Sequence, residues 1–153
     1  AGELLKGFIT TRPLDAGACN GLPSDLARCL QGSLPAIPLT GFLSLGTAVS
    51  NDISADYVFS QLTWGLGRED DILIGISTSG NSRNVILAMQ TASRKGMRRI
   101  GLTGRHGGEL ASLSDTVIRV PADPVHEIQE LHLPVYHCLS RMLEDELFPE
   151  STD

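Results

Sequence analysis

The chain has 153 residues, of which 41% are hydrophobic and 20% charged, and this length suits one compact domain but is short for two. Its formal net charge of -6 argues against nucleic acid as the main partner, because binding to phosphate backbones draws on a positive surface. A small anionic ligand is compatible with this charge, since backbone amides and hydroxyl groups can hold it locally.

The first third of the chain predicts short elements joined by irregular segments. A helix is expected at 2–8, and a loop at 12–34 that contains one short helical piece near 24–31, because Gly, Pro and Asn are frequent there. Residues 34–39, LPAIPL, qualify as a strand only if the two prolines lie at an end or where no amide is needed.

Two helices are expected next, at 41–52 and 56–67, and Gly65 and Gly67 are expected to end the second. The continuous apolar run at 70–77, DDILIGIS, predicts a strand that is covered on both faces.

The second half alternates strands and helices. Ser82 is placed to cap a helix that Gly96 closes, and apolar residues recur in it at helical spacing. Pro134 predicts a kink or local break in the last helix. The alternation predicts an α/β fold with a parallel sheet. The expected segments are a helix at 83–96, a strand at 98–104, a helix at 107–114, a strand at 115–121 and a helix at 126–148.

Four hydroxyl side chains surround Gly80 where the strand at 70–77 meets the following helix; they are Ser77, Thr78, Ser79 and Ser82. Ligands of open α/β sheets bind at such junctions, and the free amides of the helix favour an anion there. Because GxxxxGK[ST] and GxGxxG are both absent, no nucleotide cofactor is predicted and a smaller phosphate ester is favoured. The alternative, that these residues only form a turn and a cap, stays open.

The cysteines and the apolar segments bear on the compartment. Cys19, Cys29 and Cys138 show no repeated spacing, and no CxxC or HxxxH pair is present, so a cysteine metal site is not predicted. Neither a signal-peptide pattern nor an apolar run long enough to cross a bilayer occurs. We therefore expect a cytoplasmic protein without a membrane partner.

Several segments together resemble the sugar isomerase (SIS) family, and within it the phosphoheptose isomerases, which act on sedoheptulose 7-phosphate. They are GISTSGNSRNV, IGLTG and GGELASLSD, supported by ELLKGF, RP, LPAIPLT, NDI and IQELHLPVYHCL. The resemblance implies a single SIS domain over 1–153, a Rossmann-like three-layer α/β/α sandwich with a central parallel sheet. Residues 14–33 are longer than the usual connection.

The resemblance implies an aldose–ketose isomerase, an intramolecular oxidoreductase that converts sedoheptulose 7-phosphate to D-glycero-D-manno-heptose 7-phosphate through an enediol. It assigns Glu3 as the base and His137 as its acid partner. Such a reaction needs one group to take a proton from carbon while another protonates or polarises the oxygen. An ordinary solvated Glu3 and a structural, hydrogen-bonded His137 are the alternatives.

The remaining site residues are also implied by the resemblance. Asp52 and Gln129 would contact the sugar, and the four hydroxyls would bind its phosphate. Glu3, Gln129 and His137 would hold a metal, usually zinc, which can act as a Lewis acid. Residues 129 and 137 are eight apart, about 80° around a helix, so both can face one cleft.

Some family features have no counterpart in the sequence. These are the first strand, the GNGGSA-type loop and the histidine four residues before the glutamate, and we expect them, with an N-terminal helix, upstream of Ala1. His126 stands where the isomerases tend to carry an aspartate. His132 matches a family histidine for which we expect a structural role.

The resemblance also implies a homo-oligomer, expected to be a tetramer, with its sites between subunits. Two non-catalytic alternatives are a DiaA-like protein that binds the bacterial replication initiator and a regulatory domain that senses sugar phosphates. The DiaA-like branch lacks both the glutamate and the second helix histidine, so Glu3 and His137 favour the enzyme.

Overall fold

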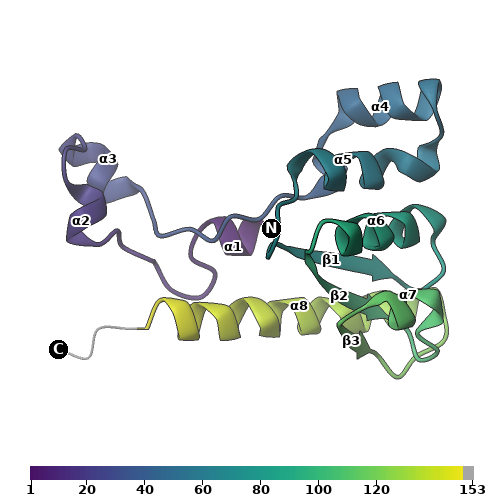
Figure 1. Cartoon of the computed structure of the whole chain (residues 1–153). Coiled ribbons are helices and arrows are strands. Elements are labelled where there is room, and N and C mark those ends of the chain that lie inside the picture. Colours follow the sequence, from purple (N-terminus) through teal and green to yellow (C-terminus); the bar gives the residue numbers. More distant parts are fainter. Residues whose placement is uncertain (150–153) are drawn as a thin grey trace. The chain divides into compact units, whose positions relative to one another are not determined.

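The computed structural model describes residues 1–149, and Figure 1 shows their helices and strands. Two compact units are present. Of the described residues, the first contains 1–38 and 134–149, and the second contains 39–133.

The first unit begins with three short helices: α1 (Gly2–Leu5), α2 (Ala16–Cys19) and α3 (Ser24–Cys29). The predicted pieces near both α1 and α3 are confirmed, although α1 stops early because Lys6 is extended. Helix α2 was not predicted from the sequence. Asp15 begins it, since its Oδ1 accepts a hydrogen bond from the Ala18 amide at 2.7 Å.

The second unit opens with the two predicted helices, both confirmed. They are α4 (Leu43–Asp52) and α5 (Val58–Leu66), and each is preceded by a 3₁₀ turn, η1 (Leu39–Gly41) and η2 (Ala55–Tyr57). Gly67 ends α5 as predicted, and its amide donates to the Thr63 carbonyl at 3.0 Å. The expectation that Gly65 also ends α5 was wrong, because Gly65 lies inside it. Residues 34–38 form no strand.

A parallel sheet follows, in the order β1-β2-β3, and this confirms the predicted α/β class. Ile74 of β1 lies opposite Ile100 of β2, and Gly101 of β2 lies opposite Val117 of β3. Helices α6 and α7 make the two crossovers (Figure 1). The bounds are β1 Ile72–Ser77, α6 Arg83–Arg94, β2 Arg98–Thr103, α7 Gly108–Leu113 and β3 Thr116–Arg119.

Helices α6 and α7 bury one face of the sheet. Ile86 and Met89 of α6 and Leu110 of α7 are at most 1% exposed and form the core cluster. The helices approach β1 so closely at Gly75 that an added Cβ would lie 2.9 Å from the Met89 sulfur. Burial of each large side chain of this kind contributes roughly 1.5–3 kcal/mol.

The opposite face of β1 is exposed, so the prediction of a strand covered on both faces was wrong. Ile72, Ile74 and Ile76 keep 60%, 50% and 52% of their surface exposed. Side chains alternate along a strand, and α6 and α7 pack only on the face that carries Leu73 and Gly75.

The last helix, α8 (Val125–Leu147), is continuous through Pro134, so of the predicted kink or local break, the break was wrong and the kink stays a prediction. Proline removes one amide donor, and the helix continues on both sides of that loss. Among residues 1–149, no helix has both the length and the apolar character needed to cross a membrane.

Candidate active site

The hydroxyl-rich turn between β1 and α6 is held together by its first and last members. The Ser77 side chain is buried, and its Oγ lies 2.8 Å from Oγ of the exposed Ser82. Ser82 occupies the predicted N-cap position, but its side chain makes no capping hydrogen bond. Ser77 therefore closes the turn from the inside, and Ser82 stays at the surface.

Asn81 connects the turn to the next crossover, a role that the sequence reading missed. Its backbone amide donates to Oγ of the exposed Ser79 at 3.1 Å, and its side-chain amide donates to the Ser79 carbonyl at 3.2 Å. Its Oδ1 accepts from the Glu109 amide of α7 at 2.9 Å. An asparagine just before a helix N-cap was the available signal.

Gly80 lets the turn pack against the start of α7. Its φ is +69°, and an added Cβ would lie 1.9 Å from the Gly107 carbonyl oxygen. Its own carbonyl accepts from the Leu110 amide at 2.9 Å. Only glycine fits this position without moving the backbone.

The outer side of the turn is suited to an anion. The first helical hydrogen bond of α6 is donated by Ile86 to the Ser82 carbonyl at 3.0 Å, so the amides of Arg83 and Asn84 precede the helical ladder. The helix dipole favours negative charge there. The Ser79 and Ser82 hydroxyls are exposed beside these amides, with Thr78 half-buried.

The first unit brings Glu3 and His137 together, 134 positions apart in the sequence. A hydrogen bond to the backbone amide of Glu3 lowers the pKa of its carboxyl, and His137 is close enough to lower this pKa further. The His137 ring lies 5.1 Å from the Phe8 ring and 4.8 Å from the Tyr136 ring, centroid to centroid. His137 is half-buried and Glu3 keeps access to solvent.

A buried ion pair lies in the same unit. Arg12 is 1% exposed, and its Nε donates to Glu144 Oε1 at 2.8 Å. Its other nitrogens donate to the carbonyls of Leu4, at 2.9 Å, and Glu3, at 3.1 Å.

The Glu144 carboxylate accepts three hydrogen bonds in all. Besides the one from Arg12, it accepts hydrogen bonds from the amides of Phe8, at 2.9 Å, and Ile9, at 2.7 Å. Burial acts to raise the pKa of Glu144, but the two amides and Arg12 outweigh burial and lower it to about 2. The sequence reading missed this pair, although an acidic residue seven positions after His137, on the same helix face, was a signal.

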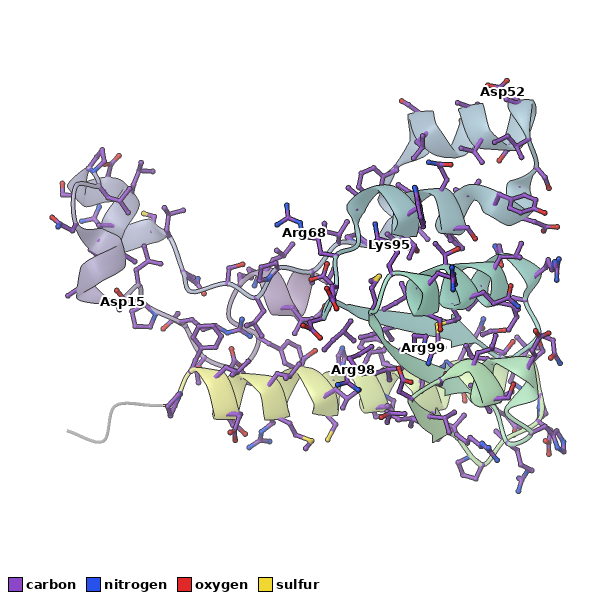
Figure 2. The ribbon with its side chains drawn as sticks, in the orientation of Figure 1. Asp15, Asp52, Arg68, Lys95, Arg98 and Arg99 are labelled. Carbon is purple, nitrogen blue, oxygen red and sulfur yellow. The ribbon has the colours of Figure 1, made fainter. Side chains whose placement is uncertain are left out.

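The other predicted site residues lie in the second unit. Asp52 is exposed at the end of α4, where Figure 2 labels it, and Gln129 is exposed on α8. His132 is 5% exposed, and its Nε2 has no hydrogen-bond partner among residues 1–149.

Two of the three donors predicted for a metal, the Glu3 carboxylate and the His137 imidazole, are of kinds that zinc accepts. In the part of the chain that the structure describes, however, no three His, Cys, Asp or Glu residues form a metal-binding group. Glu3 and His137 share one unit, and Gln129 belongs to the other.

Comparison with known proteins decides the family. Residues 43–139 match the SIS domain family. A phosphoheptose isomerase of Coxiella burnetii is 46% identical over 154 residues, which cover 99% of this chain and 68% of that relative. The chain belongs to the phosphoheptose isomerase family of SIS-domain proteins. A family member from Akkermansia muciniphila is 45% identical over 116 residues, which cover 76% of this chain and 61% of the relative.

Solved structures of the phosphoheptose isomerase family confirm the SIS fold. The enzyme from Francisella tularensis gives a TM-score of 0.73 at 40% identity, covering 75% of this chain and 62% of that one. The Neisseria gonorrhoeae enzyme gives 0.72 at 41% identity, with 74% and 63% covered. The chain thus spans between 61% and 68% of the length of these four family members.

Proposed function

We propose that the protein to which this chain belongs is an isomerase that converts sedoheptulose 7-phosphate to D-glycero-D-manno-heptose 7-phosphate. The proximity of Glu3 and His137 in the first unit carries the proposal, because it pairs a carboxylate with an imidazole in a chain similar to phosphoheptose isomerases. Neither non-catalytic alternative requires such a pair.

The chemistry needs two proton carriers. The lowered pKa of Glu3 keeps its carboxylate ionised at neutral pH, so it can take a proton from C1 of the ketose. His137 gives a proton to O2, and the product of this half-reaction is the enediol. Glu3 then returns its proton to C2 while His137 takes the proton of O1, which becomes the aldehyde oxygen. Both residues end in their starting states.

The phosphate of the substrate would bind at the turn between β1 and α6. Thr78, Ser79 and Ser82 offer hydroxyl donors there, and the amides that begin α6 add a favourable dipole. Ser77 contributes mainly by fixing Ser82. We assign Asp52 and Gln129 to the sugar hydroxyls, and no nucleotide cofactor is needed for this reaction.

Zinc is the proposed metal, with Glu3, Gln129 and His137 as its ligands. When bound, it would polarise the substrate carbonyl as a Lewis acid. The proton transfers assigned to Glu3 and His137 are written without it, and a chelator tests its contribution.

We propose a homo-oligomer, with a tetramer as the expected state, that acts in the cytoplasm. Large apolar side chains at the surface support an association between copies, since their burial is favourable. Leu43, Ile53 and Trp64 are 83%, 64% and 60% exposed.

The test is an assay in which NMR detects heptose phosphate formation by the intact protein, once with a chelator and once without. We expect turnover by the wild type and at least a 1,000-fold loss, on the order of the combined effects of acid–base groups, in Glu3→Gln. Binding of the phosphate ester should persist, because the turn is unchanged.

The matched control is Glu146→Gln, which changes an exposed glutamate of α8 and should keep wild-type turnover. Equal turnover by Glu3→Gln and the wild type would refute the assignment of the base.

A further inference from the structure

We propose that the buried Arg12–Glu144 pair positions both members of the catalytic pair: Arg12 fixes the backbone at Glu3, and Glu144 fixes the aromatic neighbour of His137. Neither residue touches the reacting atoms, so both are positioning residues. The catalytic consequence rests on the proposed isomerase function, whereas the structural coupling does not.

The conformation at Glu3 depends on contacts from outside its own helix. Helix α1 has four residues, far below the length at which a helix holds its shape in water. The Arg12 guanidinium supplies the missing support, because two of its nitrogens donate to the Glu3 and Leu4 carbonyls. The Leu34 amide also donates to the Leu4 carbonyl, at 2.9 Å.

Arg12 is itself held by Glu144 and by the Phe148 ring. Its Nε binds Glu144, and the Phe148 ring covers the guanidinium carbon at 4.6 Å from the ring centroid. A planar fork with several fixed donors sets direction as well as distance, which a lysine ammonium cannot reproduce. Motion at Arg12 would therefore be transmitted to the backbone that carries the base.

Glu144 reaches His137 by a second route. Its carboxylate anchors the amide of Phe8, and the Phe8 ring packs against the His137 ring at 5.1 Å. Glu144 follows His137 by seven residues, about two helical turns, so both lie on one face of α8. One carboxylate thus fixes the segment that contacts the imidazole and the guanidinium that holds Glu3.

A buried ion pair is a weak source of stability, because removing two charges from water offsets most of their attraction. An apolar pair of the same volume would fill the space without fixing the Glu3 carbonyl or the Phe8 amide. The geometry points to orientation as the reason for charge at these positions.

The consequence for catalysis is a loss in kcat. A displacement of about 1 Å between reacting groups can cost about 100-fold in rate. The proposed phosphate-binding turn lies in the second unit, with no residue of the pair in it, so KM should change little.

The experiment compares Glu144→Gln with wild type in the intact protein. It measures kcat and KM for sedoheptulose 7-phosphate, and the NMR chemical shifts of the His137 ring protons, assigned with His137→Gln. Asp145→Asn is the matched control, because Asp145 is the next residue and forms an exposed pair with Arg141 at 3.7 Å.

We expect Glu144→Gln to lower kcat about 10- to 100-fold, to leave KM within about twofold, and to shift the His137 ring signals as the Phe8 ring moves. Asp145→Asn should change none of these. A folded Glu144→Gln protein with wild-type kcat and unchanged His137 signals would overturn the proposal.

Two further arms separate the possible failures. If wild type does not isomerise the sugar, the proposed function fails, and the His137 signals still test the coupling. If Glu144→Gln does not fold, Arg12→Lys takes its place, because lysine keeps the positive charge and lacks the forked donors of the guanidinium. Unchanged kcat and His137 signals in Arg12→Lys would likewise overturn the proposal.

Discussion

At the scale of single residues, the polar interior of the first unit is as informative as its candidate catalytic groups. Arg12 and Glu144 are among the most buried side chains of residues 1–149, at 1% and 2% exposure. Their charged atoms form hydrogen bonds to each other and to backbone groups, and the Phe148 ring covers the Arg12 guanidinium. Loss of one partner would leave the other charge buried and unpaired.

The acid stability of the protein should therefore depend on Glu144. Its folded pKa of about 2 lies below its ordinary value of 4.5, so the unfolded chain binds more protons between these values. Stability from this group is present above pH 4.5 and is lost as pH falls towards 2.

We expect Glu144→Gln to destabilise the fold by about 3–5 kcal/mol at neutral pH and by progressively less below pH 4.5. Urea unfolding of both proteins over a pH series measures this difference. A difference that is constant from pH 7 to pH 3 would contradict the account of Glu144.

At the scale of elements, the anion-binding turn depends on the packing of one crossover against the next. The β1–α6 turn and the start of α7 meet at Gly80 and Gly107, both with positive φ. Asn81 adds a hydrogen bond across the same junction. The position of the hydroxyls is thus set by two elements rather than one.

Gly80→Ala should open this junction. An alanine at φ +69° costs about 1–2 kcal/mol, and its Cβ would meet the Gly107 carbonyl at 1.9 Å. We expect destabilisation of at least about 2 kcal/mol and at least about tenfold weaker binding of inorganic phosphate, measured by urea unfolding and calorimetry.

Gly65→Ala is the control for this change, because nothing lies within 4 Å of an added Cβ there and the residue is helical. It should stabilise the protein by about 0.5–1 kcal/mol. Phosphate binding by Gly80→Ala equal to that of the control would contradict the role of the junction.

The sequence predicted the elements of the second unit well because their signals are local. The helical spacing of apolar residues predicted α6, and a continuous apolar run predicted β1. Coverage of β1 on both faces was not predictable from that run, since a continuous run shows apolar character without showing what packs on it. The predicted break at Pro134 does not occur, because a proline removes only one hydrogen bond from this helix of 23 residues.

At the scale of the whole molecule, the sequence and its family resemblance reached the site only in part. Glu3 and His137 were predicted from the resemblance, and the structure brings them together within one unit. The Arg12–Glu144 pair was missed because its members are 132 positions apart and neither belongs to a local motif. Roles for Asp52, Gln129 and the hydroxyls stay predictions.

The most direct test of the proposed chemistry is the isomerisation run in D₂O, with the product analysed by NMR. Because the proton held by the Glu3 carboxyl can exchange with D₂O before it is returned, proton transfer through Glu3 predicts deuterium at C2 of the heptose phosphate formed by the wild type. Glu3→Gln should give neither exchange nor product. Deuterium incorporation of equal extent and rate with Glu3→Gln would contradict the assignment of Glu3 as the group that moves the proton.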